Sequence, residues 1–297
     1  AIVTAAAGLV AESSVRRNQT LAQAVTQSTG ISTTAGRGDA PAQFDLAMTY
    51  MRGDRVKRDY VQAVHLLRPV ADQGYPEAQY NLGFMYANGL GVEQNYAEAR
   101  KWYTMAASQG VAEAQLNLAS MYSVGQGVSK DAVEAFRLTR MAADKNNAIG
   151  QARLGIFYLQ GIGVERHYIE GEKWLSLAVK QGSADAQYAL GGAYALGRNF
   201  PQNVIEGVRL LRLAAVQGHA SAQKLLGLVL SINIRGPQDL VEAYVWSNLA
   251  VAGGADEARS LRDEIAGKMT VQQISQAQEL AATFRPTKNN IPILAKP

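Results

Sequence analysis

Residues 82–92 read LGFMYANGLGV and carry a Gly-x-Gly motif at Gly89 and Gly91. A glycine loop can expose backbone N–H groups to a phosphate, but it can equally form a tight corner between two helices. Related segments recur every 36 residues, with LASMYSVGQGV starting at Leu118 and LGIFYLQGIGV at Leu154. Weaker copies start at Leu46, Leu190 and Leu226. A phosphate site is needed once, so six evenly spaced copies indicate a repeated architecture.

The first half of the 36-residue unit, numbered from Ala42, Ala78 and their equivalents, has helical periodicity. Position 2 is Gln and position 5 is Leu in all six copies, position 6 is always Ala or Gly, and position 9 is Tyr in five. Positions 1, 5, 8 and 9 share one face, which predicts an amphipathic helix. The small residue at position 6 lets a neighbouring helix approach closely. Gly89 and its equivalents at position 12 suit the left-handed conformation that often ends a helix.

The second half of the unit predicts a second helix. Position 18 is a preferred N-cap residue in five copies, among them Asp59 and Asp239, and is His167 in the fourth. A glutamate stands three residues later in five copies, which makes a capping-box-like pair and favours the positive end of the helix. Position 33 is Gly in five copies and closes the unit. Each unit is therefore helix, glycine corner, helix, glycine corner.

The consensus A-Q-x-x-L-G-x-x-Y-x-x-G-x-G-V-x-x-D-x-x-E-A-x-x-W-x-x-x-A-A-x-x-G resembles the Sel-1-like repeat, a relative of the tetratricopeptide repeat. The resemblance covers residues 42–257, and the second copy is the clearest. Arg55, Asn199 and Arg235 depart from it at the second corner glycine. The resemblance implies an all-α, right-handed α/α superhelical solenoid of six 36-residue helix pairs.

Beyond the repeats, residues 258–285 are expected to form C-terminal capping helices. Asp263 stands where the small packing residue should be, and an acid there cannot be buried against a following repeat. Thr270 and Gln273 predict a capping box at the start of a last helix. Such a polar-faced terminal element is what a solenoid needs for solubility. Residues 286–297 are expected to be a flexible tail.

Residues 1–41 precede the repeats and are expected to hold one helix and a linker. The small apolar start, AIVTAAAGLVAES, fits either the remnant of a signal peptide or an ordinary Ala-rich segment. The first interpretation predicts a periplasmic or secreted protein, and the second a cytoplasmic one.

Composition excludes several classes of function. Among 297 residues 47% are hydrophobic, the formal charge is +4, and Lys and Arg are scattered rather than gathered on one stripe, so no nucleic-acid partner is expected. No run of about 18 apolar residues predicts a membrane span. The absence of cysteine excludes disulfides, thiolate nucleophiles and cysteine-liganded zinc.

The sequence predicts no catalytic, cofactor-binding or metal site. His65, His167 and His219 fall at three different repeat positions, 24, 18 and 34, so they need not converge in space. Disulfide-rich members of the resembled family have been linked to β-lactam hydrolysis. This chain has no cysteine and no Ser-x-x-Lys motif, which makes a β-lactam hydrolase the less favoured alternative.

The face of the first helix opposite the core is the remaining candidate for a binding surface. Positions 3, 4, 7 and 11 point away from positions 1, 5 and 9. Resemblance to tetratricopeptide-like solenoids implies that these positions line a concave groove. Their mixture of aromatic, aliphatic and amide side chains suits an extended peptide better than a phosphate or a base. The predicted partner-binding residues are Tyr80, Asn81, Phe84, Asn88, Asn117, Ser120, Arg153, Ile156, Gln160 and Tyr188.

The sequence therefore predicts a monomeric, non-enzymatic scaffold or adaptor that binds a peptide or protein partner in its concave groove. The resemblance implies adaptor or regulatory work, often in bacterial envelope processes such as signalling, secretion or polysaccharide export. A glycan-binding envelope scaffold is an alternative, and it would need aromatic platforms such as Phe44, Tyr80, Phe84 and Tyr188. The convex side and the N-terminal segment are the other candidate binding surfaces.

Overall fold

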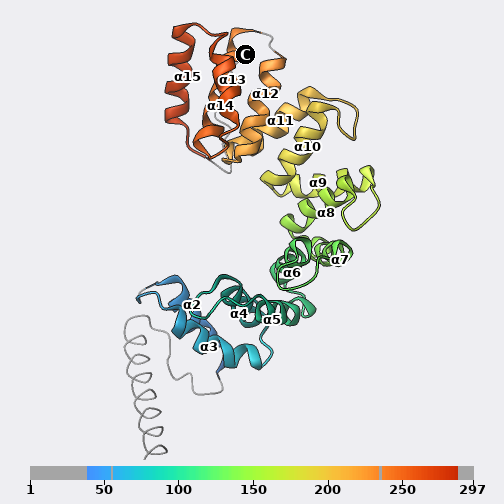
Figure 1. Ribbon diagram of the computed structural model, residues 1–297, viewed down its shortest axis with the longest axis vertical. Coiled ribbons are helices and arrows are strands. Elements are labelled where there is room, and N and C mark those ends of the chain that lie inside the picture. Colours follow the sequence, from blue (N-terminus) through green and yellow to red (C-terminus); the bar gives the residue numbers. More distant parts are fainter. Residues whose placement is uncertain (1–38, 55, 234–235, 287–297) are drawn as a thin grey trace, which may run out of the picture. The chain divides into compact units, whose positions relative to one another are not determined.

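The computed structural model describes residues 39–54, 56–233 and 236–286, and every regular element in them is a helix (Figure 1). The N-terminal helix and signal-peptide remnant expected within residues 1–38, and the tail from residue 287, lie outside the described residues. The helices are α2 (Ala40–Arg52), α3 (Tyr60–Asp72), α4 (Pro76–Asn88), α5 (Tyr96–Ser108), α6 (Ala112–Val124), α7 (Ala132–Asp144), α8 (Ala148–Gln160), α9 (Tyr168–Lys180), α10 (Ala184–Leu196), α11 (Val204–Val216), α12 (Ala220–Ile232), α13 (Pro237–Ala252), α14 (Ala258–Ala266) and α15 (Val271–Thr283).

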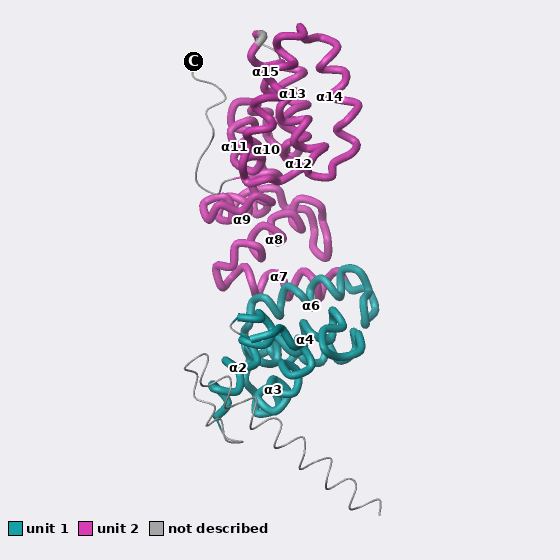
Figure 2. The backbone as a smooth tube through the Cα atoms, turned by 90° about the vertical axis from the view of Figure 1, so that its left-hand side faces the viewer, with its two compact units in different colours: residues 1–131 teal, residues 132–297 magenta. Residues whose placement is uncertain are grey.

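The chain divides into two compact units, Ala1–Asp131 and Ala132–Pro297 (Figure 2). The first unit contains α2 to α6 and the second contains α7 to α15. Within each unit, successive helices pack against one another, except that α15 packs mainly on α13 rather than on α14. The predicted all-α fold of helix-pair repeats is confirmed.

The first helix of each pair is held at its apolar face, as α4 shows. Pro76 starts α4, where its fixed φ suits the first turn, and Leu82 and Met85 are fully buried. Gly83, at the small position 6, lies against α5, since a Cβ there would come within 2.8 Å of the Tyr103 ring. The close approach predicted from small residues is thus present. The burial of Leu118 and Leu154 at position 5 is confirmed as well.

The Gly-x-Gly motif is a helix–helix corner. Gly89 is the C-cap of α4 with φ +65°, and Gly91 follows with φ +71°, both in the left-handed region that costs a residue with a Cβ about 1–2 kcal/mol. In the fifth copy Asn199 takes the second glycine's place and keeps the same conformation, with φ +70°. Asparagine is among the side chains that tolerate this region best. The other two departures, Arg55 and Arg235, lie outside the described residues.

The second helices start where position 18 predicts, with one exception. The carboxylate of Asp59 and the amide oxygen of Asn203 accept hydrogen bonds from backbone N–H groups of the first turn, and His167 Nδ1 does the same at 3.2 Å. The prediction for Asp239 was wrong, because α13 begins at Pro237 with Gly236 as its N-cap. Proline at the first position of a helix needs no N–H partner, so the helix starts a turn earlier.

The end of the second unit is covered by α14 and α15. Ile265 of α14 and Ala277 of α15 are buried in one cluster with Trp246 of α13, and the Phe284 ring packs edge-on against Trp246. The capping box predicted for Thr270 and Gln273 is present at the start of α15.

Candidate functional site

The first unit contains a cleft of about 330 Å³ between α4, α5 and α6. We call it the amide cleft, because four side-chain amides line it and no charged side chain does. Phe84, with 37% of its surface exposed, supplies its main aromatic wall. The lining residues are Phe84, Ala87, Asn88, Gln94, Tyr96, Tyr103, Asn117, Ser120, Met121 and Gln126.

Asn117 links two tyrosines beside this cleft. The rings of Tyr80 and Tyr103 lie 6.0 Å apart, and the Asn117 side chain hydrogen-bonds with both hydroxyls. Burial raises the pKa of Tyr103 and of Tyr80 above the ordinary value of 10.0, so both hydroxyls stay protonated beyond the pH at which an exposed tyrosine ionises. Asn117 of α6 therefore joins side chains of α4 and α5 beside the cleft.

Two other amides of the cleft, Asn88 and Gln94, are held by groups close to them in the sequence. Asn88 Nδ2 donates to the Phe84 carbonyl at 2.8 Å, one turn back in α4. Gln94 Nε2 donates to the Ala87 carbonyl at 2.9 Å and to the Tyr96 hydroxyl at 2.8 Å. The N–H groups of both residues are thereby fixed, and each amide keeps an oxygen that can accept a hydrogen bond.

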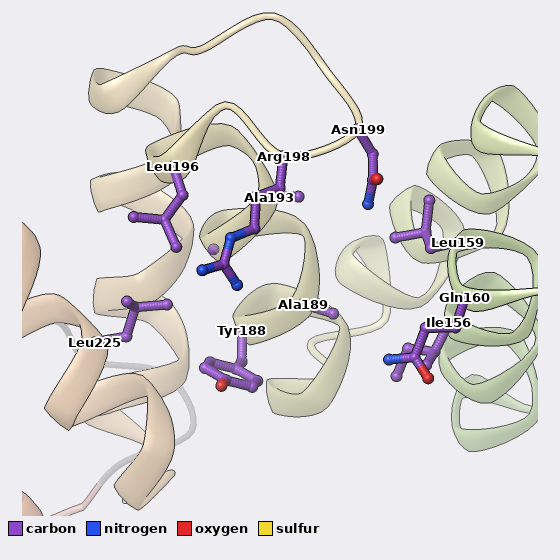
Figure 3. Close-up of a pocket in the computed structure, with 11 residues that line it drawn as sticks. Ile156, Leu159, Gln160, Tyr188, Ala189, Ala193, Leu196, Arg198, Asn199 and Leu225 are labelled. Carbon is purple, nitrogen blue, oxygen red and sulfur yellow. The ribbon is translucent and has the colours of Figure 1, made fainter.

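The second unit contains a cleft of about 280 Å³ bounded by α8, α10 and α12 (Figure 3). We call it the aliphatic cleft. Leucine and isoleucine side chains form its two sides, and alanine and glycine of α10 form its floor. The lining residues are Ile156, Leu159, Gln160, Tyr188, Ala189, Gly192, Ala193, Leu196, Arg198, Asn199 and Leu225.

A missing side chain opens the aliphatic cleft. Gly192 occupies position 7 of the repeat, where the second and fourth copies have Phe84 and Ile156. A Cβ on Gly192 would come within 3.0 Å of Leu225, so even a small side chain would enter this space. The cleft exists because the fifth copy lacks the large residue that its neighbours carry.

Tyr188 is held in place at one side of this cleft. Its ring stacks on His219 with 4.9 Å between centroids. His219 caps α12 by accepting from the Ala222 N–H at 3.1 Å, and its other ring nitrogen lies 3.2 Å from Asp185. The ring of Tyr188 therefore rests on a side chain that is itself fixed at both nitrogens.

Seven of the ten predicted residues line one of these two clefts, and three do not. Asn81 donates to the Glu77 carbonyl of its own helix, and neither Asn81 nor Arg153 lines a cleft. Tyr80 packs on Tyr103 beside the amide cleft. The four that line the amide cleft are Phe84, Asn88, Asn117 and Ser120, and the three that line the aliphatic cleft are Ile156, Gln160 and Tyr188.

The sequence prediction missed a lining position in both clefts. Gln126 and Arg198 stand at position 13, between the two corner glycine positions, and each lines the cleft of its unit. The signal was available, because the equivalent residues Leu90 and Ile162 are aliphatic. In the third and fifth copies a polar residue at position 13 thus borders a cleft.

A third, more open depression lies on the second helices of the second unit, between α9 and α11. Its charged residues include Glu206 and Arg209, which form an ion pair at 2.6 Å. The hydrogen bond from Arg209 lowers the pKa of Glu206. The first-helix clefts are the better candidates for binding, because they contain seven of the ten predicted residues and this depression contains none.

The described residues contain no group of three or more His, Asp or Glu side chains that could hold a metal ion. His167 and His219 serve as helix N-caps. No helix in the described part of the chain has both the length and the apolarity to cross a membrane.

The sequence profile of the Sel1 repeat family matches five consecutive stretches, which are residues 40–75, 76–111, 112–147, 148–183 and 184–219. This chain belongs to the Sel1 repeat family. The sixth predicted copy lies beyond the match, but Gln223 of α12 donates to the Ala215 carbonyl as Gln79 of α4 donates to that of Ala71. The sixth helix pair thus continues the contacts of the matched repeats.

Two solved structures are similar to this chain. The chain is 30% identical to a Sel1 repeat protein from Oxalobacter formigenes, with a TM-score of 0.66, over 72% of this chain and 88% of that one. It is 24% identical to a protective antigen of uropathogenic Escherichia coli with the SLR fold, with a TM-score of 0.57, over 86% of this chain and 62% of that one. The second likeness shows the fold alone. No curated protein sequence matches the chain.

Sel1 repeats are protein-interaction modules, and the family is generally non-catalytic. The family therefore gives the class of function, and the two clefts give the surfaces on which to look for it.

Proposed function

We propose that this Sel1 repeat protein is a non-enzymatic adaptor that binds an extended segment of a protein partner against its first helices. The observation that carries the proposal is the amide cleft, where Phe84 stands exposed beside Asn88, Asn117 and Ser120. An extended peptide needs donors and acceptors for its backbone and an apolar anchor for its side chains. The cleft offers both.

The uncharged lining favours a site that hydrogen-bonds with the backbone of a bound peptide. No Lys, Arg, Asp or Glu lines the amide cleft, so a partner would gain little there from charge. The amide oxygens of Asn88 and Gln94 can accept from peptide N–H groups, and the Ser120 hydroxyl can donate or accept. Phe84 is the side chain whose burial by a partner would release the most apolar surface.

The glycan alternative finds less support in this geometry. A sugar ring is usually held on an open aromatic face, but Tyr80 and Tyr103 are half-buried or buried and packed against each other. Phe84 is then the one exposed aromatic platform of the cleft. The glycan array in the following experiment tests this alternative.

The test measures binding of the full-length chain to a tiled peptide array and to a glycan array. The lead peptide is then titrated against wild type, Phe84→Ala and Met105→Ala. Met105 is the matched control, because it is equally exposed at 37% but lies on α5 outside the cleft. We expect Phe84→Ala to weaken binding by at least about 1 kcal/mol, roughly fivefold, and Met105→Ala to leave it unchanged.

Two results would contradict the proposal. Equal affinity of Phe84→Ala and wild type would move the binding surface away from the amide cleft. Selective binding of glycans, with no peptide bound, would replace the peptide partner with a saccharide. Melting temperatures of all variants must stay near the wild-type value, so that lost binding is not lost folding.

The cellular setting that we propose is a bacterial envelope, signalling or secretion process. The support is the family resemblance together with the bacterial origin of the 30% identical relative. Crosslinking in the native host followed by identification of the partner tests this setting, and a partner confined to cytoplasmic metabolism would contradict it.

A further inference from the structure

We propose that the aliphatic cleft of the second unit captures the carboxyl terminus of a peptide, with Arg198 pairing with the terminal carboxylate and the cleft taking the last, aliphatic side chain. This inference rests on the proposed function and specifies its second contact site. It assigns a ligand chemistry to a surface that the amide cleft does not include.

The first observation is the unpaired charge of Arg198. Its guanidinium makes no ion pair and no side-chain hydrogen bond within the described residues, although most other arginines of the second unit have such a partner. Figure 3 shows its side chain directed from the α10–α11 corner into the cleft, toward Tyr188. None of the lining residues carries a negative charge. A carboxylate is the group that complements this site best.

The second observation is the apolar space beside that charge. Leu196 and Leu225 form one side of the cleft and Ile156 and Leu159 the other, and the missing side chain of Gly192 leaves room between them. The volume of about 280 Å³ suits one branched aliphatic side chain with its backbone rather than a long segment. The ligand must therefore present an apolar group and a carboxylate close together.

The spacing of these two groups selects a chain end. In an extended peptide, neighbouring side chains point to opposite sides, so an Asp or Glu next to the buried aliphatic residue would point away from the cleft. An acid two residues away points to the same side but lies about 6–7 Å along the strand, which is too far for both groups to enter one short cleft. A terminal carboxylate is bonded to the same Cα as the last side chain, so both groups enter one short cleft.

The corner that carries Arg198 is built to hold it there. Its neighbours Gly197 and Asn199 both have left-handed backbone conformations, φ +64° and φ +70°, and the Arg198 N–H donates to the Ala193 carbonyl at 2.9 Å. The backbone of Arg198 is thus fixed on both sides, so binding costs side-chain freedom but little backbone freedom.

The test uses the full chain and a defined minimal ligand. N-acetyl-L-leucine is titrated into the ¹⁵N-labelled protein, and binding is followed by amide chemical shifts. The comparison ligands are N-acetyl-L-leucinamide and the dipeptide N-acetyl-L-glutamyl-L-leucinamide. We expect the free acid to shift the amides around Gly192 and Arg198, and to bind about tenfold more tightly than the leucinamide. The dipeptide, whose only carboxylate is a side chain, should bind no better than the leucinamide.

Variants assign the effect to the two parts of the site. Arg198→Gln should abolish the preference for the free acid, whereas Arg140→Gln on α7, the control with the same charge change, should preserve it. Gly192→Ile restores the large side chain of the fourth copy and should block the cleft. Its fold is checked by circular dichroism, and the exposed Arg198→Gln variant decides the matter if Gly192→Ile does not fold.

Equal binding of acid and amide, an unchanged preference in Arg198→Gln, or shifts confined to other residues would overturn the inference. A dipeptide that binds as well as the free acid would replace the chain end with an internal acidic residue and would also overturn it. These outcomes are separate from the Phe84 test. A peptide that depends on Phe84 but not on Arg198 would leave the adaptor function standing while this inference fails.

Discussion

Gln109 donates a hydrogen bond from Nε2 to Oε1 of Gln79, 30 residues earlier in the chain, at 2.8 Å. Gln79 in turn donates from its own Nε2 to the Ala71 carbonyl at 3.1 Å, near the end of α3. One buried amide thus joins a first helix to the second helices before and after it. The same amide-to-amide bond joins Gln181 to Gln151 and Gln217 to Gln187. Among the described residues the amide-to-amide bond occurs in the second, fourth and fifth copies, and the bond to the preceding helix carbonyl in the second, third and sixth, so each of these five copies uses its position-2 Gln in at least one of the two bonds.

The first prediction concerns this amide. Gln79 is 1% exposed, so its removal leaves the Ala71 carbonyl without its side-chain donor in a dry environment. We expect Gln79→Ala to lower the free energy of unfolding by about 1–3 kcal/mol. Urea unfolding of the full chain measures the change. Gln276→Ala, which removes an exposed amide from α15, is the control and should change stability by less than about 0.5 kcal/mol.

The second prediction separates the two glycines of one corner. Both Gly89 and Gly91 have positive φ, so an alanine at either position costs about 1–2 kcal/mol in backbone strain. A Cβ on Gly89 would meet its nearest neighbour, Gln94, at 3.4 Å, whereas one on Gly91 would overlap the backbone of Tyr60 at the start of α3. Gly91→Ala should therefore lower the melting temperature clearly more than Gly89→Ala. Equal effects would show that the corner does not pack on the preceding repeat.

These two glycines also show how much of the fold could be predicted from the sequence. Their 36-residue recurrence predicts the helix ends, because left-handed corners and caps depend on local residues. The start of α13 was mispredicted, since Asp239 matched the repeat position while Pro237 decided the helix start.

The candidate site was less accessible from sequence. A helical wheel identifies Phe84 and Ile156 as outward-facing, but the aliphatic cleft depends on what Gly192 lacks. Asn117 looked like a free groove amide, yet it bonds to two tyrosines from different helices. Such contacts depend on how helices stack, which a pattern along one helix does not contain.

The third prediction is a loss of stability at alkaline pH. Burial, followed by the hydrogen bond to Glu172 and the charges of Glu172 and Glu206, raises the pKa of Tyr194 to about 12 from its ordinary value of 10.0. The folded chain therefore holds this proton more tightly than the unfolded chain. The stabilising contribution is complete below about pH 10 and is lost as the pH rises toward about 12.

Urea unfolding at about pH 9 and about pH 11 measures this loss. Tyr194→Phe has no hydroxyl to titrate, so its stability should fall less between the two pH values than that of wild type. An equal fall in both proteins would assign the pH dependence to other groups. Ultraviolet absorbance should also show Tyr194 ionising after the exposed tyrosines.

The last prediction concerns the contact between the fifth and sixth helix pairs. Arg212 of α11 forms two hydrogen bonds with Glu242 of α13, at 2.8 and 2.7 Å, and Trp246 Nε1 donates to the same carboxylate at 3.1 Å. Glu242 is 7% exposed. Removing Arg212 alone would leave a buried carboxylate with a single neutral donor, which costs about 3–5 kcal/mol in buried pairs of this kind.

We therefore expect Arg212→Leu to destabilise the chain by about 2–4 kcal/mol, the lower bound reflecting the partial exposure of the arginine. The double variant Arg212→Leu with Glu242→Leu removes both charges, so it should regain most of that loss even though two substitutions are present. Urea unfolding of both single variants and the double variant closes the cycle. Additive losses in the double variant would show that the two side chains stabilise the fold independently, and the ion pair would then not hold the sixth helix pair to the fifth.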